Sequence, residues 1–171
     1  MAGRKILIFI LVMIVFGISG WAFAKKAYDL FTKETINADK VLVRITKEDS
    51  SKKYSNWPSY TGMRPGKAPH GPFHKIFINS IIKDALPLDN KTIPNGGIVV
   101  KEAYDTDREL STIAVMVKVK DYDPENGDWF YLDLDAEGKI LLSGKEPICI
   151  KCHKAYKNND YLIVYKLDKK Q

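Results

Sequence analysis

The chain contains only two cysteines among its 171 residues, and both lie near the C-terminus. Two cysteines can close at most one disulfide, which excludes a small scaffold held together by several disulfides. Histidine is also scarce, with three residues. A zinc site of cysteine and histidine would therefore need nearly all of these side chains. Chemistry that depends on thiols or imidazoles is confined to a few positions.

Long runs of like charge, internal repeats and low-complexity segments are missing as well. Lysines alternate with aspartates and glutamates, and the net charge of +6 is modest. This pattern indicates a solvated surface rather than a site for a polyanion, so we expect no nucleic-acid partner. Lysine-rich faces can still steer an acidic redox partner. The length and the 45% hydrophobic content fit one globular domain and exclude a multidomain enzyme.

One long apolar segment stands at the N-terminus. Arg4 and Lys5 precede an unbroken apolar run over residues 6–17, and an Ala-Phe-Ala triplet then offers a cleavage pattern. Residues 1–24 are therefore interpreted as a signal peptide or as an N-terminal membrane anchor, because residues 6–24 are long enough to cross a bilayer. Both interpretations predict export to the periplasm, either as a soluble protein after cleavage or tethered to the cytoplasmic membrane.

The remaining residues, 25–171, are predicted to form one α+β domain. Short segments rich in β-branched residues predominate, with turn signals between them, which favours a predominantly antiparallel β-sheet with a few short helices. Residues 50–72 have no clear period and are expected to form a long ordered loop. The predicted strands cover residues 41–45, 73–79, 98–104, 112–119, 129–134, 139–142 and 161–167, and the predicted helices cover residues 27–38 and 80–86.

Alternation along the predicted strands sorts their side chains by face. In residues 112–119, the isoleucine and valines at odd positions share one face and form the expected core, which leaves Met116 on the other face. In residues 98–104, Glu102 lies in line with apolar neighbours. A carboxylate in that setting lies at a wet rim or is buried for a functional reason.

The two cysteines belong to the segment CIKCH, residues 149–153. This spacing is typical of covalent c-type haem attachment, in which both thiols form thioethers with the porphyrin and the adjacent histidine ligates the iron. The sequence therefore predicts one haem c attached through Cys149 and Cys152, with His153 as the proximal iron ligand. Three alternatives are a zinc site completed by His70 and His74, a redox-active CxxC, and a structural disulfide.

The ligand on the other side of the iron is left open by the sequence. A strong second ligand is typical of electron carriers, whereas an open pocket favours small diatomic or nitrogenous ligands. The candidates for a second ligand are Met63, Met116, His70 and His74. None of them is distinguished by its position in the sequence.

Several segments together resemble the cytochrome P-460 family, which includes the β-sheet relatives of cytochrome c prime. They are NWPSYTGMRPGKAPHGPFHKIFIN (residues 56–79), IPNGGIVVKE (residues 93–102), GDWFY (residues 127–131), and CIKCH with the following NNDYL. The CxxCH spacing occurs in all c-type cytochromes, so the other segments carry the resemblance. They lie in order and cover most of residues 56–162.

The resemblance implies a sheet-rich homodimer with a pentacoordinate haem and an apolar and aromatic distal pocket. Catalytic members oxidise hydroxylamine and handle nitric oxide, and we expect a redox partner protein for this chain. Other members bind nitric oxide or carbon monoxide without established turnover. In the catalytic members a lysine is cross-linked to the porphyrin, and Lys67, Lys75 and Lys101 all lie near matching segments.

The resemblance also suggests roles for three further residues. Glu102 could act as a catalytic acid beside the distal site, because burial would raise its pKa and allow it to move protons. Its alternative is an edge residue paired with a lysine. Phe73 or Phe77 could cap the distal iron as part of the haem-binding site, and the alternative for both is ordinary core packing.

Overall fold

The computed structural model describes residues 31–46, 53–57, 59–89 and 91–163. The chain divides into two units, Met1–Phe31, of which only Phe31 is described, and Thr32–Gln171. The predicted signal peptide or anchor over residues 1–24 lies outside the described residues. Within the described ranges, no helix has both the length and the apolar character that a membrane span requires.

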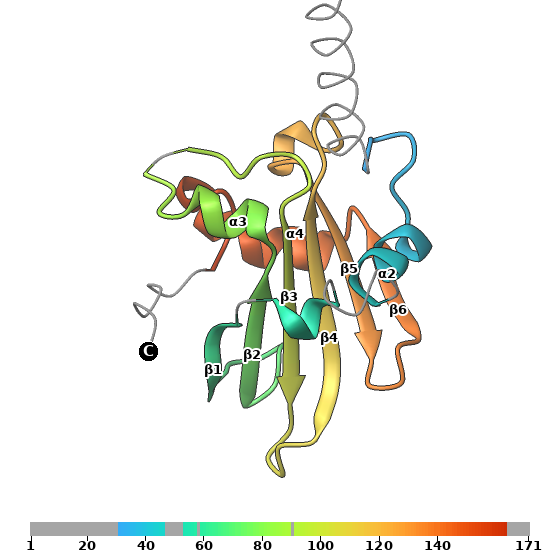
Figure 1. Ribbon diagram of the computed structural model, residues 1–171, viewed down its shortest axis with the longest axis vertical. Helices are drawn as coiled ribbons and strands as arrows, with labels where there is room; N and C mark the ends of the chain where they lie inside the picture. The colour runs from blue at the N-terminus through green and yellow to red at the C-terminus, as the bar shows by residue number, and fades with distance from the viewer. Residues whose placement is uncertain (1–30, 47–52, 58, 90, 164–171) are drawn as a thin grey trace, which may run out of the picture. The chain divides into compact units, whose positions relative to one another are not determined.

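The second unit is built on a six-stranded antiparallel sheet whose strand order follows the sequence (Figure 1). Each strand pairs antiparallel with the next one in the sequence. This architecture confirms the prediction of a mainly antiparallel α+β fold. The strands are β1 (Ser59–Pro65), β2 (Phe73–Ile78), β3 (Ile98–Tyr104), β4 (Leu110–Lys118), β5 (Trp129–Asp135) and β6 (Ile140–Gly144).

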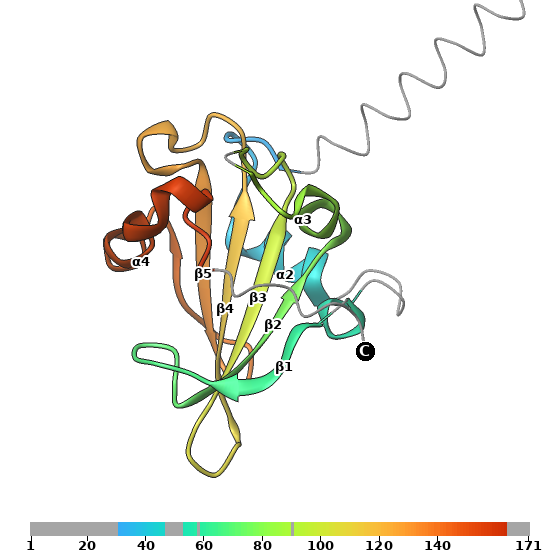
Figure 2. The ribbon, with the colours of Figure 1, turned by 90° about the vertical axis from the view of Figure 1, so that its left-hand side faces the viewer.

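Short helices cover both faces of this sheet. The helices are α2 (Ala38–Thr46), α3 (Ser80–Ala85) and α4 (Pro147–His153), with 3-10 turns η1 (Tyr54–Asn56), η2 (Pro124–Asn126) and η3 (Lys154–Asn159). Figure 2 places α2 and α4 on opposite sides of the sheet. We call the sheet side that carries Val99, Lys101 and Met116 the α4 face, and the side that carries Val100 and Glu102 the α2 face.

The first predicted strand is wrong, because residues 41–45 belong to helix α2. The buried pair Val41 and Ile45 has the four-residue spacing of one helix face, and Val43 between them is 48% exposed. Asn37 caps the helix by accepting a hydrogen bond from Lys40 N at 2.9 Å. The β-branched run over residues 41–45 is compatible with either a helix or a strand. The Asn37 cap and the burial of Val41 and Ile45 stabilise the helix.

Two other predictions are corrected at the ends of the domain. The predicted helix over residues 27–38 falls partly outside the described residues. Of its described part, residues 31–37 contain a turn and no helix, and residue 38 begins α2. The predicted loop over residues 50–72 contains η1 and β1. Residues 161–163 of the predicted last strand are not in a strand, and its remaining residues lie outside the described ranges.

Both faces of the sheet are packed, so β4 has buried side chains on both faces and not only on the predicted core face. Val115 and Val117 are buried on the α2 face, as predicted. Met116 lies on the α4 face and is also buried, at 8% exposure. It belongs to a second core cluster that includes Ile78, Trp129 and Tyr131. The sheet therefore has a core on each side.

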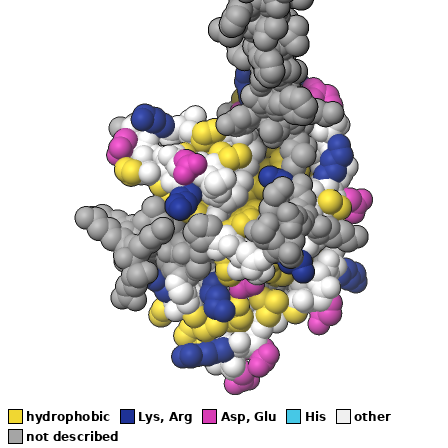
Figure 3. All heavy atoms as spheres, viewed as in Figure 1, with side chains coloured by type: hydrophobic (Ala, Val, Ile, Leu, Met, Phe, Trp, Pro, Cys, Tyr) yellow, Lys and Arg dark blue, Asp and Glu magenta, His cyan; other side chains and the backbone are white. Residues whose placement is uncertain are grey.

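The surface carries charges of both signs. Figure 3 shows lysines, arginines, aspartates and glutamates dispersed among hydrophobic and other side chains on the side seen in Figure 1. No histidine is visible among the described atoms of this view. This distribution agrees with the interleaved charge pattern of the sequence.

Candidate cofactor cavity

Helix α4 brings the CIKCH side chains together. Pro147 stands in its first turn, where a missing N–H costs no helical hydrogen bond. Cys149, Cys152 and His153 follow at positions i, i+3 and i+4, which lie on one side of a helix. All three line the same cavity between α4 and the sheet. The local helix thus converts a sequence spacing into a cluster facing one space.

The cavity occupies the α4 face of the sheet and has an empty volume of about 1130 Å³, including its opening to solvent. Its lining is mainly apolar. Strand pairing arranges its floor in two rows across the sheet, Ile76–Lys101–Ala114–Asp133–Leu142 and Ile78–Val99–Met116–Tyr131.

The His153 ring is held in one orientation. Its Nδ1 lies 2.8 Å from the carbonyl oxygen of Tyr161. Because a carbonyl oxygen can only accept, Nδ1 carries the proton and Nε2 keeps the lone pair that a metal ligand needs. Burial lowers the pKa of His153, and the charge of Lys101 acts in the same direction against the Tyr161 hydrogen bond. The neutral imidazole is therefore the form present at pH 7.

The thiol of Cys149 is not activated as a nucleophile. Burial raises its pKa to about 11, and the nearby carboxylate of Asp133 acts in the same direction. Cysteines of redox-active CxxC motifs have lowered pKa values instead. No parallel βαβ unit precedes the motif in the described part of the chain, since every strand pairing there is antiparallel. A redox-active CxxC thus finds no support in the structure.

Besides His153 and the two cysteines, four polar side chains interrupt the apolar lining. Burial raises the pKa of Asp133 to about 6 and lowers the pKa of Lys101. Burial also lowers the pKa of His70 to about 4, with a contribution from the charges of Lys101, His153 and His74. The Tyr131 hydroxyl is buried and has no hydrogen-bond partner among the described residues. The cavity therefore offers a proton acceptor, a cation and an unpaired hydroxyl.

Glu102 lies on the α2 face and does not line this cavity. Its carboxylate accepts hydrogen bonds from the hydroxyls of Tyr54 at 3.0 Å and Tyr104 at 2.5 Å. Burial and the charge of Glu102 raise the pKa of Tyr54. The structure therefore places the predicted catalytic carboxylate with two tyrosines, and it does not bring Glu102 together with His153.

Phe73 and Phe77 share the α2 face with Glu102 in the same sheet. The Phe77 ring packs edge-on against Tyr54, with 5.4 Å between the ring centroids. The Arg108 guanidinium lies 5.3 Å from the centroid of the Phe73 ring. Neither phenylalanine lines the cavity.

The other candidates divide between the cavity and the rest of the sheet. Met116 and His70 line the cavity, whereas His74 is buried in β2. Of the three lysines, Lys101 lines the cavity, and Lys75 has its ammonium 5.1 Å from the centroid of the Tyr104 ring. Alternation along residues 98–104 correctly places Lys101 and Glu102 on opposite faces of the sheet. Lys101 is the one on the α4 face.

Asp133 and Tyr131 were missed by the sequence reasoning. The signal was present, because the two residues alternate with Leu132 in β5 and therefore share a face. An acidic residue in line with a buried tyrosine and Trp129 is the same pattern that drew attention to Glu102. Only the position of α4 shows which of the two carboxylates faces the cavity.

The cavity suits a large planar apolar group. Its apolar walls would cover a porphyrin, and the two thiols and the imidazole lie on one helix beside it. The oriented Nε2 of His153 is a suitable donor for iron. No cluster of three or more metal-ligating side chains occurs in the described ranges, whereas a structural zinc site needs four. The residues present therefore fit a haem.

The fold and the site define a sheet-based protein whose CxxCH helix closes an apolar cavity. The chain belongs to the cytochrome P460 family, whose family model matches residues 51–164. This membership confirms the resemblance found in the sequence and implies a haem cofactor. No curated protein sequence matches the chain.

Proposed function

We propose that the chain carries one haem c, joined by thioethers to Cys149 and Cys152 and ligated by His153. The carrying observation is that these three side chains line one apolar cavity on one side of α4. The hydrogen bond from His153 Nδ1 to the Tyr161 carbonyl further supports this assignment, since iron-ligating histidines are usually oriented in this way.

We further propose that the sheet side of the cavity receives a small nitrogenous or diatomic ligand, and that hydroxylamine or nitric oxide is oxidised there. When bound, the haem iron supplies the site for this ligand and accepts its electrons. Apolar side chains such as Val99 and Met116 exclude water from the same space. The small side chain of Ala114 leaves room above the centre of the sheet.

Asp133 is the proposed proton acceptor of this reaction. Oxidation of hydroxylamine releases protons together with electrons, and a general base works best when its pKa lies near the operating pH. The pKa of Asp133, raised to about 6 by burial, meets this requirement. Lys101 lies in the same cross-strand row, separated from Asp133 by Ala114. Its cationic side chain would favour the ionised form of a bound anion or of Asp133.

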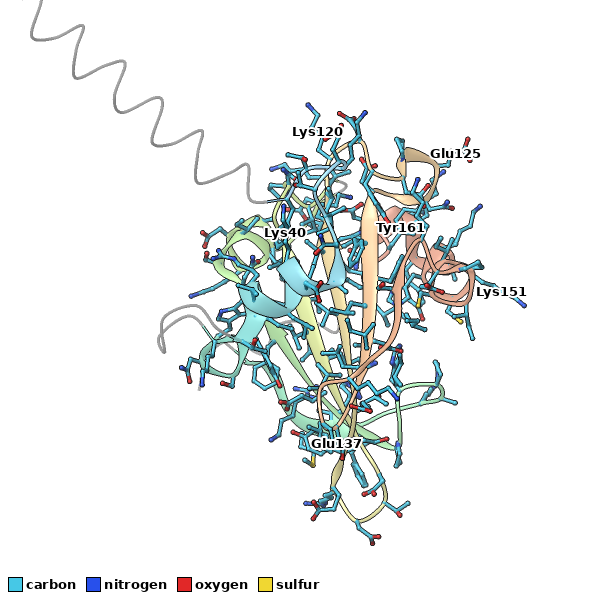
Figure 4. The ribbon with its side chains drawn as sticks, turned by 90° about the vertical axis from the view of Figure 1, so that its right-hand side faces the viewer. Lys40, Lys120, Glu125, Glu137, Lys151 and Tyr161 are labelled. Carbon is cyan, nitrogen blue, oxygen red and sulfur yellow. The ribbon has the colours of Figure 1, made fainter. Side chains whose placement is uncertain are left out.

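The electrons would leave through a redox partner protein with an acidic surface. The α4–η3 segment carries the exposed lysines Lys151, Lys154 and Lys157 beside the exposed Cys152. Figure 4 shows Lys151 pointing outward from α4. Positive charge next to the proposed haem edge would steer such a partner. The proposal also includes export through residues 1–24 and assembly as a homodimer, which measurement of the mass in solution would test.

Absorption spectra of the purified protein test the proposed function. A high-spin, five-coordinate haem that remains attached after acid denaturation is the expected result. A six-coordinate low-spin spectrum in both oxidation states would contradict an open ligand site. Addition of hydroxylamine with an electron acceptor then separates the candidates. Turnover supports the oxidase, while binding of nitric oxide without turnover supports the alternative, a gas-binding or electron-transfer cytochrome.

A further inference from the structure

A buried ion pair lies beyond the wall of the cavity, between the end of β4 and the segment after η3. Lys118 Nζ lies 2.7 and 2.9 Å from the two carboxylate oxygens of Asp160. The two side chains are only 9% and 4% exposed. Lys118 Nζ also donates to the carbonyl oxygen of Gly127 at 2.6 Å and lies 5.0 Å from the centroid of the Trp129 ring. Neither Lys118 nor Asp160 lines the cavity.

Asp160 joins three separate parts of the fold. Its carboxylate accepts a hydrogen bond from the Ile93 amide at 2.7 Å. Its backbone carbonyl accepts one from Trp129 Nε1 at 2.9 Å. Asp160 and Tyr161 also have positive φ angles of 49° and 64°. Left-handed conformations are unfavourable for most residues other than glycine, so other contacts must hold this turn in place.

The turn held in this way carries the carbonyl that orients His153. Tyr161 O accepts the hydrogen bond from His153 Nδ1, and Tyr161 is the residue that directly follows Asp160. The Tyr161 ring lies against Gly127, where an added Cβ would meet it at 2.4 Å. Figure 4 shows Tyr161 beside α4. Asp160 and Gly127, to which Lys118 donates its hydrogen bonds, therefore lie against the Tyr161 backbone and ring respectively.

We propose that Lys118 and Asp160 are positioning residues for the iron ligand, acting through the Tyr161 carbonyl on His153. This inference rests on the proposed function, because it requires His153 to bind the haem iron. A buried ion pair seldom stabilises a fold more than an apolar pair of the same size, so stability alone does not explain it. The Lys118–Asp160 ion pair instead holds the left-handed turn at Asp160 and Tyr161 in place. A firmly held acceptor at Nδ1 makes the imidazole a stronger donor to iron.

The test removes the ion pair from the haem-loaded protein with little change in side-chain size. In the double variant Lys118→Met/Asp160→Asn, the methionine keeps the stem against Trp129, and asparagine tolerates a positive φ. It also avoids leaving one buried charge unpaired. We expect the iron–histidine stretching vibration of the ferrous protein to shift to lower frequency. The reduction potential should become more positive, because a weaker donor stabilises ferric iron less.

The matched control is Lys120→Met/Asp121→Asn, which removes the same two charges from exposed positions just beyond β4. Asp121 also has a positive φ, of 61°. The control should reproduce the wild-type vibration and potential. If Lys118→Met/Asp160→Asn also matches wild type in both readouts, the positioning role is refuted. If the wild-type protein shows no iron–histidine vibration, the proposed function fails first, and this inference fails with it.

A second measurement needs no substitution and decides the matter if the double variant does not fold. In the wild-type protein labelled with ¹⁵N-histidine, in its ferrous form saturated with carbon monoxide, the His153 Nδ1 proton is followed by exchange into deuterated water. If Lys118 and Asp160 hold the Tyr161 carbonyl in place, the Nδ1 proton should exchange as slowly as the β4 amides. Exchange as fast as that of a solvent-exposed imidazole would overturn the proposal.

Discussion

Gly127 is the position where one added methyl group should have the clearest effect on stability and on the site. Its φ of +82° lies in the left-handed region, and an added Cβ would lie 2.4 Å from two carbons of the Tyr161 ring. In Gly127→Ala the backbone contributes about 1–2 kcal/mol of destabilisation. Overpacking against the ring contributes about 1–3 kcal/mol more. The free energy of unfolding should therefore fall by about 2–5 kcal/mol.

Gly138 provides a matched control for the backbone term. Its φ is +84°, and an added Cβ would meet no atom within 4 Å. Gly138→Ala should therefore cost only the backbone term of about 1–2 kcal/mol. Urea unfolding of the haem-loaded proteins, followed by far-ultraviolet circular dichroism, measures both variants. With a denaturant slope of about 2 kcal/mol per molar, a difference of about 2 kcal/mol separates the two midpoints by about 1 M.

Equal midpoints for the two alanine variants would refute the argument, because the left-handed backbone would then be the whole effect. The comparison also bears on the site. Displacement of the Tyr161 ring in Gly127→Ala should disturb the hydrogen bond to His153 Nδ1. An added Cβ at Gly138, in the turn between β5 and β6, would displace no side chain. We therefore expect an altered iron–histidine vibration in Gly127→Ala alone.

Three further predictions concern the cavity. Ala114→Leu should fill the floor between Lys101 and Asp133 and sharply lower the haem-to-protein ratio, whereas Ala136→Leu in the β5–β6 turn should leave that ratio unchanged. Hydroxylamine oxidation should fall as the pH drops through about 6, because protonated Asp133 cannot accept a proton, and Asp133→Asn should be slow at every pH. Burial raises the pKa of Asp133 in the folded state, so wild type should lose stability relative to Asp133→Asn as the pH rises from about 4 to about 6. Thermal unfolding measures this difference in stability. A difference that does not change with pH would contradict the raised pKa.

Local patterns in the sequence were sufficient for most of the strands and for the attachment motif. Strands β2 to β6 follow from alternation and turn residues, because both depend on neighbours within a few positions. The i, i+3, i+4 spacing of Cys149, Cys152 and His153 needs only a single helical turn to become a cluster. These features would be expected in any fold that kept the same local structure.

Local sequence patterns were not sufficient to predict the helix at residues 38–46. Its β-branched run fits either period, and the decision came from the Asn37 cap and from burial of Val41 and Ile45. Glu102 and Lys101 show a second limit. Alternation places them on opposite faces of β3, but the sequence of the strand does not determine which face α4 covers.

The sequence by itself determined that this chain has an α+β fold, a CxxCH motif and the features of the cytochrome P460 family, and the structure added that the motif lies on helix α4. The tertiary structure alone decided that Asp133, Lys101 and Tyr131 share a cavity with His153, while Glu102 packs with tyrosines on the other side. It also joined Lys118 to Asp160 across 42 positions of the chain. The physical reason is that helix packing chooses between two sheet faces, and this choice depends on contacts among segments distant in sequence.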